Sequence, residues 1–172
     1  MRYLYFWVEG EDDQRFVESV FIPHIAGYDA ILVQKYASMK HAKVRAFLRS
    51  IKRSGQEVIF LADRDHAPCI QRRIDAVREK YSVPKEFPIV IVCREIEGWY
   101  LAGLADLGNR SLWSGSKNVD VNTIQKLKFN EGKPNRFVYR IDWMIELLKN
   151  HDRACARARS ASFNRTCAML HL

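Results

Sequence analysis

The chain has 172 residues, of which 48% are hydrophobic and 28% are charged. This length fits a single domain, residues 1–172, with a sizeable core, and the composition excludes a disordered chain. No apolar run reaches the about 18 residues that a membrane-spanning helix needs. The apolar start, residues 1–8, lacks a basic region followed by a cleavage site, so we expect a buried strand, no membrane partner and a cytoplasmic protein. None of the four cysteines forms a C-x-x-C pair, which argues against a zinc site.

The chain carries a net positive charge. Lys and Arg number 28 and Asp and Glu number 20, so the formal net charge is +8. A local acidic cluster within a basic chain can hold cations while the remainder attracts a polyanion. The alternative is a domain that is basic without any functional reason.

Apolar runs alternate with amphipathic stretches along the first two thirds of the chain. Strands are predicted over residues 3–8, 30–36, 58–62 and 87–93. Helices are predicted over residues 11–21, 39–53, 70–81 and 95–104, and Ser38 is expected to cap the second of them. Uniformly apolar strands that alternate with helices predict an α/β, Rossmann-like fold with a mainly parallel sheet of about four strands.

The remainder of the chain differs in composition. Residues 106–133 are rich in Gly, Asn, Ser and Lys, and they predict a long loop with a short helix near residues 121–127. Residues 136–150 predict an amphipathic helix, and residues 151–172 a basic helical tail. We therefore expect an α/β core over residues 3–104 and a helical C-terminal extension over residues 105–172.

Acidic residues follow the predicted strands. Glu9 comes after the first strand, Asp63 and Asp65 after the third, and Glu95 and Glu97 after the fourth. Ligands of parallel sheets bind beyond the carboxyl ends of the strands, and Mg²⁺ prefers oxygen ligands. In an extended backbone, residues two apart project to the same side, so we expect the two aspartates to point together.

A competing explanation is that acids stabilise helix starts, and we assign that role to Glu11 and Asp12. It is weaker for Asp63 and Asp65, because a carboxylate pair that ends an apolar strand is unfavourable unless something compensates it. Asp13 lies four residues after Glu9, one turn into the next helix, and can face the same cleft.

The order of these motifs resembles the Toprim superfamily. The likeness is greatest to the small Toprim-like proteins associated with phage defence and to the nuclease domain of the OLD family. It covers residues 3–104 and rests on three motifs, which are Val8-Glu9-Gly10-x-x-Asp13, Leu61-Ala62-Asp63-Arg64-Asp65 and Glu95-Ile96-Glu97-x-Trp99-Tyr100-Leu101.

The resemblance implies a role for each acid. A Glu in the position of Glu9 acts in acid–base chemistry and metal binding, and the pair Asp63 and Asp65 binds Mg²⁺, for which Mn²⁺ can substitute. Asp13 stands where OLD-like proteins carry an acid, and the third acidic element corresponds to Glu97, or else to Glu95. Nuclease members also use a later lysine, for which the candidates are Lys117, Lys126, Lys128 and Lys133.

Two functions are compatible with these features. The first is a Mg²⁺-dependent nuclease that cleaves DNA or RNA in phage defence, with catalytic residues Glu9, Asp63 and Asp65. The second is a non-catalytic Toprim-like module that binds nucleic acid or a partner protein. Either is compatible with an oligomer and with a separately encoded ATPase or other defence protein as partner.

A basic helix supplies the expected nucleic-acid surface. We assign this role to Lys43, Arg49, Lys52 and Arg53 within residues 39–53. A solvated helix face explains the same residues equally well.

Overall fold

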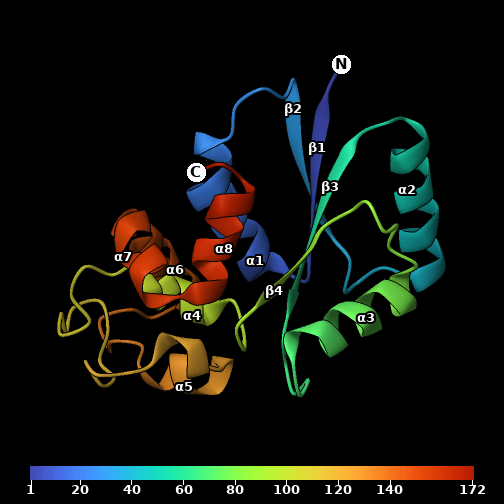
Figure 1. Cartoon of the computed structure of the whole chain (residues 1–172). Coiled ribbons are helices and arrows are strands. Elements are labelled where there is room, and N and C mark those ends of the chain that lie inside the picture. The colour runs from blue at the N-terminus through green and yellow to red at the C-terminus, as the bar shows by residue number, and fades with distance from the viewer. The chain divides into compact units, whose positions relative to one another are not determined.

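Four parallel strands form one sheet, as predicted. In the computed structural model, which describes all 172 residues, the neighbours run in the order β2-β1-β3-β4 (Figure 1). Every neighbouring pair is parallel. The strands are β1 (Tyr3–Val8), β2 (Ala30–Lys35), β3 (Glu57–Asp63) and β4 (Ile89–Val92). Most residues of β1, β3 and β4 are buried, which accounts for their apolar sequences.

The chain forms two compact units, and the first, Met1–Val92, contains the whole sheet. Its helices are α1 (Glu11–Phe16), α2 (His41–Arg53) and α3 (Ile70–Tyr81). Figure 1 shows α1 on one face of the sheet and α2 and α3 on the other. The architecture is α/β and consistent with a Rossmann-like fold.

The strand order creates a switch in direction between β1 and β3. From β1 the chain passes through α1 to β2, and it then returns through α2 on the opposite face to pair β3 with the free side of β1. In open α/β sheets a crevice forms outside the carboxyl ends of the strands where the order reverses. The residues that follow β1 and β3 therefore border that crevice.

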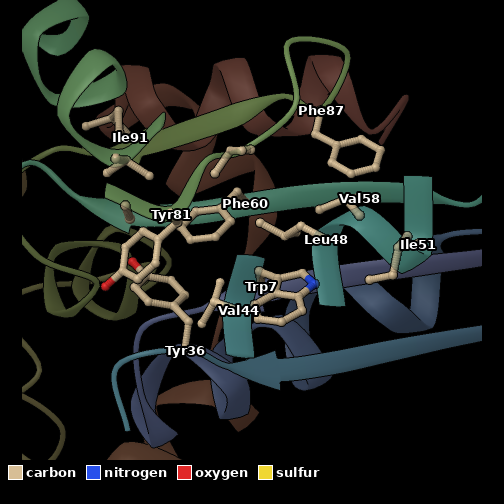
Figure 2. Packing of buried hydrophobic residues seen from close by; sticks show 13 residues of the cluster. Trp7, Tyr36, Val44, Leu48, Ile51, Val58, Phe60, Tyr81, Phe87 and Ile91 are labelled. Carbon is tan, nitrogen blue, oxygen red and sulfur yellow. The ribbon is translucent and has the colours of Figure 1, made fainter. Parts of the chain in front are cut away.

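An aromatic cluster packs the sheet against α2 and α3. Figure 2 shows Tyr36, Phe60 and Tyr81 close together in this cluster. The Tyr36 and Phe60 rings stack with centroids 4.5 Å apart, and Tyr36 meets Tyr81 edge to face at 5.0 Å. The buried Tyr36 hydroxyl donates to the Leu61 carbonyl at 3.1 Å. These contacts fix the loop after β2 and the end of α3 against β3.

Two predicted helix limits differ from the structure. The helix predicted over residues 11–21 changes after α1 into a π-helical turn, η1 (Val17–Phe21), and then into a 3-10 turn, η2 (Ile22–His24). The assignment of Ser38 as a helix cap was wrong. The Met39 N–H donates to the Tyr36 carbonyl in a turn, so α2 begins only after Lys40.

The second unit, Cys93–Leu172, is helical, as predicted for the C-terminal part. Trp113 and Trp143 stack with centroids 6.3 Å apart, and Phe129 stacks on Trp143 at 4.3 Å. None of the helices in the chain has the length and apolarity that crossing a bilayer requires. The unit comprises α4 (Glu97–Ala102), η3 (Val121–Thr123), α5 (Lys126–Glu131), α6 (Arg140–Lys149), α7 (Arg153–Arg159) and α8 (Ala161–Met169).

His151 joins two parts of this second unit. Its Nε2 lies 3.2 Å from the Trp99 carbonyl, and its ring occupies the space that a side chain at Gly103 would need. Burial lowers the pKa of His151 from about 6.5 to about 4, and the Arg153 cation acts in the same direction. The hydrogen bond to Trp99 and the Asp152 carboxylate oppose this decrease.

We predict that the free energy of unfolding falls as the pH decreases from about 6.5 to about 4. In that window the unfolded chain binds a proton at His151 that the folded chain does not, so acid favours unfolding by up to about 3 kcal/mol. Urea denaturation of the wild type and of His151→Gln at pH 7, 5.5 and 4.5 measures this contribution. Equal slopes with pH in the two proteins would contradict it.

Candidate active site

Glu9 follows β1 directly and faces the neighbouring strand end. Its side chain accepts a hydrogen bond from the main chain of Asp63, while its Oε2 is buried without a hydrogen-bond partner. Burial raises the pKa of Glu9, and the negative charge of Asp65 adds to the increase. The cations of Arg73 and Lys80 act in the opposite direction. The Glu9 carboxyl group is therefore poorly solvated and lies close to both aspartates.

Asp63 and Asp65 do not share an extended backbone. Asp63 is the last residue of β3, whereas Asp65 has a φ of 51°, in the left-handed region. The expectation that the two side chains project from one extended segment was wrong, because the chain turns between them. Aspartate tolerates the left-handed region better than most residues, and such conformations are frequent at functional sites.

Arg73 of α3 ties this turn to the helix that follows it. Its Nε donates to the Asp63 carbonyl at 2.6 Å, and its Nη2 lies 2.6 Å from Asp65 Oδ2. The Arg73 side chain is 24% exposed and that of Asp65 is 44% exposed, so the ion pair is partly exposed to solvent. A cation from the chain itself thus offsets part of the acidic charge.

The pKa of the Tyr36 hydroxyl depends on several of these acids. Burial raises the pKa of Tyr36, and the negative charges of Glu9, Asp13 and Asp63 raise it further. Asp13 is buried, and its Oδ2 accepts a hydrogen bond from the Gly10 N–H at 3.0 Å, which caps α1. Glu9, Asp13 and Asp63 thus lie within electrostatic reach of Tyr36, and Asp65 within reach of Glu9.

Glu95 and Glu97 belong to the second unit. The Glu97 side chain is 4% exposed, and its Oε1 pairs with Arg140 Nη2 at 2.7 Å. Arg140 also donates to Asn130 and lies over the Phe129 ring. The Glu95 carboxylate accepts a hydrogen bond from the Lys126 main chain. Within this unit both carboxylates have structural partners, and the metal-binding role of Glu97 stays a prediction.

The acids around β1 and β3 offer the donor type that Mg²⁺ requires. No group of three or more His, Cys, Asp or Glu side chains is arranged to hold a metal ion. Mg²⁺ needs only one or two protein carboxylates, because waters and substrate phosphates complete its octahedron. The buried Glu9 Oε2 has no hydrogen-bond partner and would gain from a nearby cation. The donor type therefore suits the ion, and a metal site at these residues stays a prediction.

The predicted nucleic-acid residues lie along α2, which runs away from the site. α2 begins after the carboxyl end of β2 and ends before the amino end of β3, so Lys43 lies near the crevice end and Arg49, Lys52 and Arg53 toward the opposite edge. Lys52 pairs with Glu86 at 2.6 Å. The candidate lysines Lys117, Lys126, Lys128 and Lys133 all lie in the second unit.

A pocket of about 180 Å³ adjoins Glu9, and sequence analysis did not identify its polar residues. Arg73 and Lys80 lie seven residues apart on α3, a spacing that puts them on one helix face. That spacing was visible in the sequence, but which face turns toward Glu9 depends on how α3 packs. The pocket is lined by Glu9, Tyr36, Ala37, His41, Arg73, Ala76, Val77, Lys80 and Tyr81.

Comparison with known proteins identifies no relative. No family model, no curated protein and no solved structure matches the chain. The likeness to the Toprim superfamily therefore rests on the motifs alone and stays a prediction.

We predict that Glu97→Ala lowers the free energy of unfolding by roughly 3 kcal/mol, because it leaves Arg140 without its buried carboxylate partner. Urea denaturation in EDTA measures the loss without any contribution from metal. The control is Glu146→Ala, which removes the carboxylate of the more exposed Lys149 pair and is expected to change the value by less than about 1 kcal/mol. Similar small losses in both variants would contradict the structural role of Glu97.

Proposed function

We propose that this chain is a Toprim-like, Mg²⁺-dependent nuclease that hydrolyses phosphodiester bonds in DNA or RNA. The observation that carries the proposal is the meeting of Glu9 with Asp63 and Asp65 at the switch between β1 and β3, with Glu9 Oε2 buried and without a hydrogen-bond partner. Ligands of open α/β sheets bind at such a switch. The net charge of +8 suits a polyanionic substrate.

The proposed reaction adds water to the phosphorus atom and breaks its bond to one bridging oxygen. The products are a strand with a terminal phosphate monoester and a strand with a free hydroxyl. Mg²⁺ held by Asp63 and Asp65 would supply charge neutralisation at the phosphate. Glu9 accepts the proton of the attacking water, a role that suits a poorly solvated carboxylate whose pKa is raised. Arg73 orients the Asp65 carboxylate beside it.

One observation favours the second candidate function. Arg73 already pairs with Asp65, so one of the two aspartates that would bind Mg²⁺ is neutralised by the chain itself. In a module that binds nucleic acid or a partner protein without cleaving it, this ion pair would have only a structural role. The two candidates differ in whether divalent cations bind, and both are compatible with a cytoplasmic defence protein that works with a separately encoded partner.

We predict that Mg²⁺ and Mn²⁺ raise the melting temperature of the wild type relative to EDTA. A cation that binds only the folded chain stabilises it by about 2.7 kcal/mol at 100 times its dissociation constant. Asp63→Asn should lose most of this gain, because an amide is a poorer metal ligand than a carboxylate. The control is Asp75→Asn, which neutralises an exposed carboxylate on α3 and should keep the gain. Identical melting temperatures under all three conditions in the wild type and both variants would rule out the metal site.

We predict that Glu9→Gln abolishes cleavage but retains nucleic-acid affinity. Loss of a general base slows a reaction by about 100-fold or more, whereas affinity depends mainly on Lys and Arg. The assay incubates single- and double-stranded DNA and RNA with Mg²⁺ or Mn²⁺, and Glu79→Gln on the exposed side of α3 is the matched control. Equal cleavage by wild type and Glu9→Gln would exclude Glu9 as the general base, and no cleavage of any substrate by the wild type would favour the non-catalytic module.

A further inference from the structure

The pocket beside Glu9 is formed by three elements of the first unit. Tyr36 and Ala37 come from the loop after β2, His41 from the first turn of α2, and the remaining residues from α3. Glu9 forms the side of the pocket that meets the acidic site. The pocket and the proposed reaction centre therefore share one carboxylate.

Two cations, Arg73 and Lys80, and the His41 ring contribute to the rest of the lining. Lys80 lies over the Tyr81 ring, 5.1 Å from its centroid, and the His41 ring meets the same tyrosine edge to face at 5.1 Å. The first turn of α2 has no side-chain cap, and the Lys43 N–H donates to the Lys40 carbonyl, which leaves the N–H groups of His41 and Ala42 for an anion. With Arg73, these groups provide charge and donors for a phosphate next to Glu9.

The volume of the pocket limits what can enter. About 180 Å³ is below the roughly 300 Å³ of the smallest drug-sized sites. A phosphate group and its first waters fit, but a nucleoside does not. An internal phosphodiester carries a nucleoside on both sides, so only a phosphate at the end of a chain can enter fully.

We infer that this pocket binds the terminal phosphate monoester of a nucleic-acid strand, held by Arg73, Lys80, His41 and the first turn of α2. The inference rests on the proposed function, because hydrolysis of a phosphodiester produces such a terminus beside Glu9. The enzyme would thereby hold one end of its product or substrate strand. The bases would remain outside the pocket, so recognition of the terminus would not depend on sequence.

Two variants test the pocket through different properties. Lys80→Gln removes one cation, while Ala76→Leu fills the space and leaves every charge in place at an exposed helix position. Lys85→Gln is the control. Lys85 is also an exposed cation, but it lies in the loop before β4 and does not line the pocket. All three residues lie outside the proposed catalytic set, and leucine and glutamine are both good helix formers.

Isothermal titration in EDTA measures the affinity of each protein for a dinucleotide with a 5′-phosphate, with a 3′-phosphate, or with neither. We expect at least one phosphorylated form to bind the wild type about tenfold more tightly than the unphosphorylated form. Lys80→Gln and Ala76→Leu should each remove that advantage, and Lys85→Gln should retain it. Equal affinity for all three dinucleotides, or an advantage that survives Ala76→Leu, would overturn the inference, because general attraction would then explain the binding.

The titration is independent of the cleavage assay because no metal is present. A wild-type protein that cleaves nucleic acid with Mg²⁺ but shows no preference for a terminal phosphate overturns the pocket inference and leaves the proposed function intact. A preference for the terminal phosphate that both pocket variants remove, in a protein that never cleaves, supports the pocket and overturns the nuclease.

Discussion

The parallel pairing of β1 with β3 is the constraint on which the candidate site depends. Leu4 to Trp7 of β1 align with Glu57 to Phe60 of β3, so the carboxyl ends of both strands lie at one edge of the sheet. The chain leaves β1 through α1 on one face and β3 through α3 on the other. Because both strands end at this edge, the Glu9 side chain meets the main chain of Asp63 there.

Electrostatic compensation explains how an acidic cluster persists in this arrangement. Like charges that are partly removed from water destabilise the folded chain unless cations lie near them. Arg73 is the cation that contacts this site, because it pairs with Asp65 and donates to the Asp63 carbonyl. Lys80 lowers the pKa of Glu9 by a smaller amount than Arg73 does. A metal ion would therefore enter a site whose charge is already partly balanced, and it would share Asp65 with Arg73.

Glu97 and Glu9 differ in how their buried oxygens are satisfied. In the second unit, Glu97 pairs with Arg140 at 2.7 Å, which is how a fold commonly stabilises a carboxylate with little solvent. In the first unit, Glu9 has an oxygen, Oε2, that is buried and accepts no hydrogen bond. A buried acceptor without a partner is unfavourable by about 1–3 kcal/mol, and such atoms are uncommon in folded proteins. The contrast favours a ligand at Glu9.

The sequence by itself determined the elements. Uniformly apolar runs predicted the four parallel strands, and the acids that follow them were correctly located at strand ends, because short-range patterns of apolar and polar residues control local structure. Only the tertiary structure decided that Asp65 turns into the left-handed region and pairs with Arg73, and that Arg73 and Lys80 face Glu9. Those outcomes depend on which face of α3 packs against β3 and Tyr36. Packing between distant segments leaves no periodic signal in the residues themselves, and for that reason the pocket could not be predicted from the sequence.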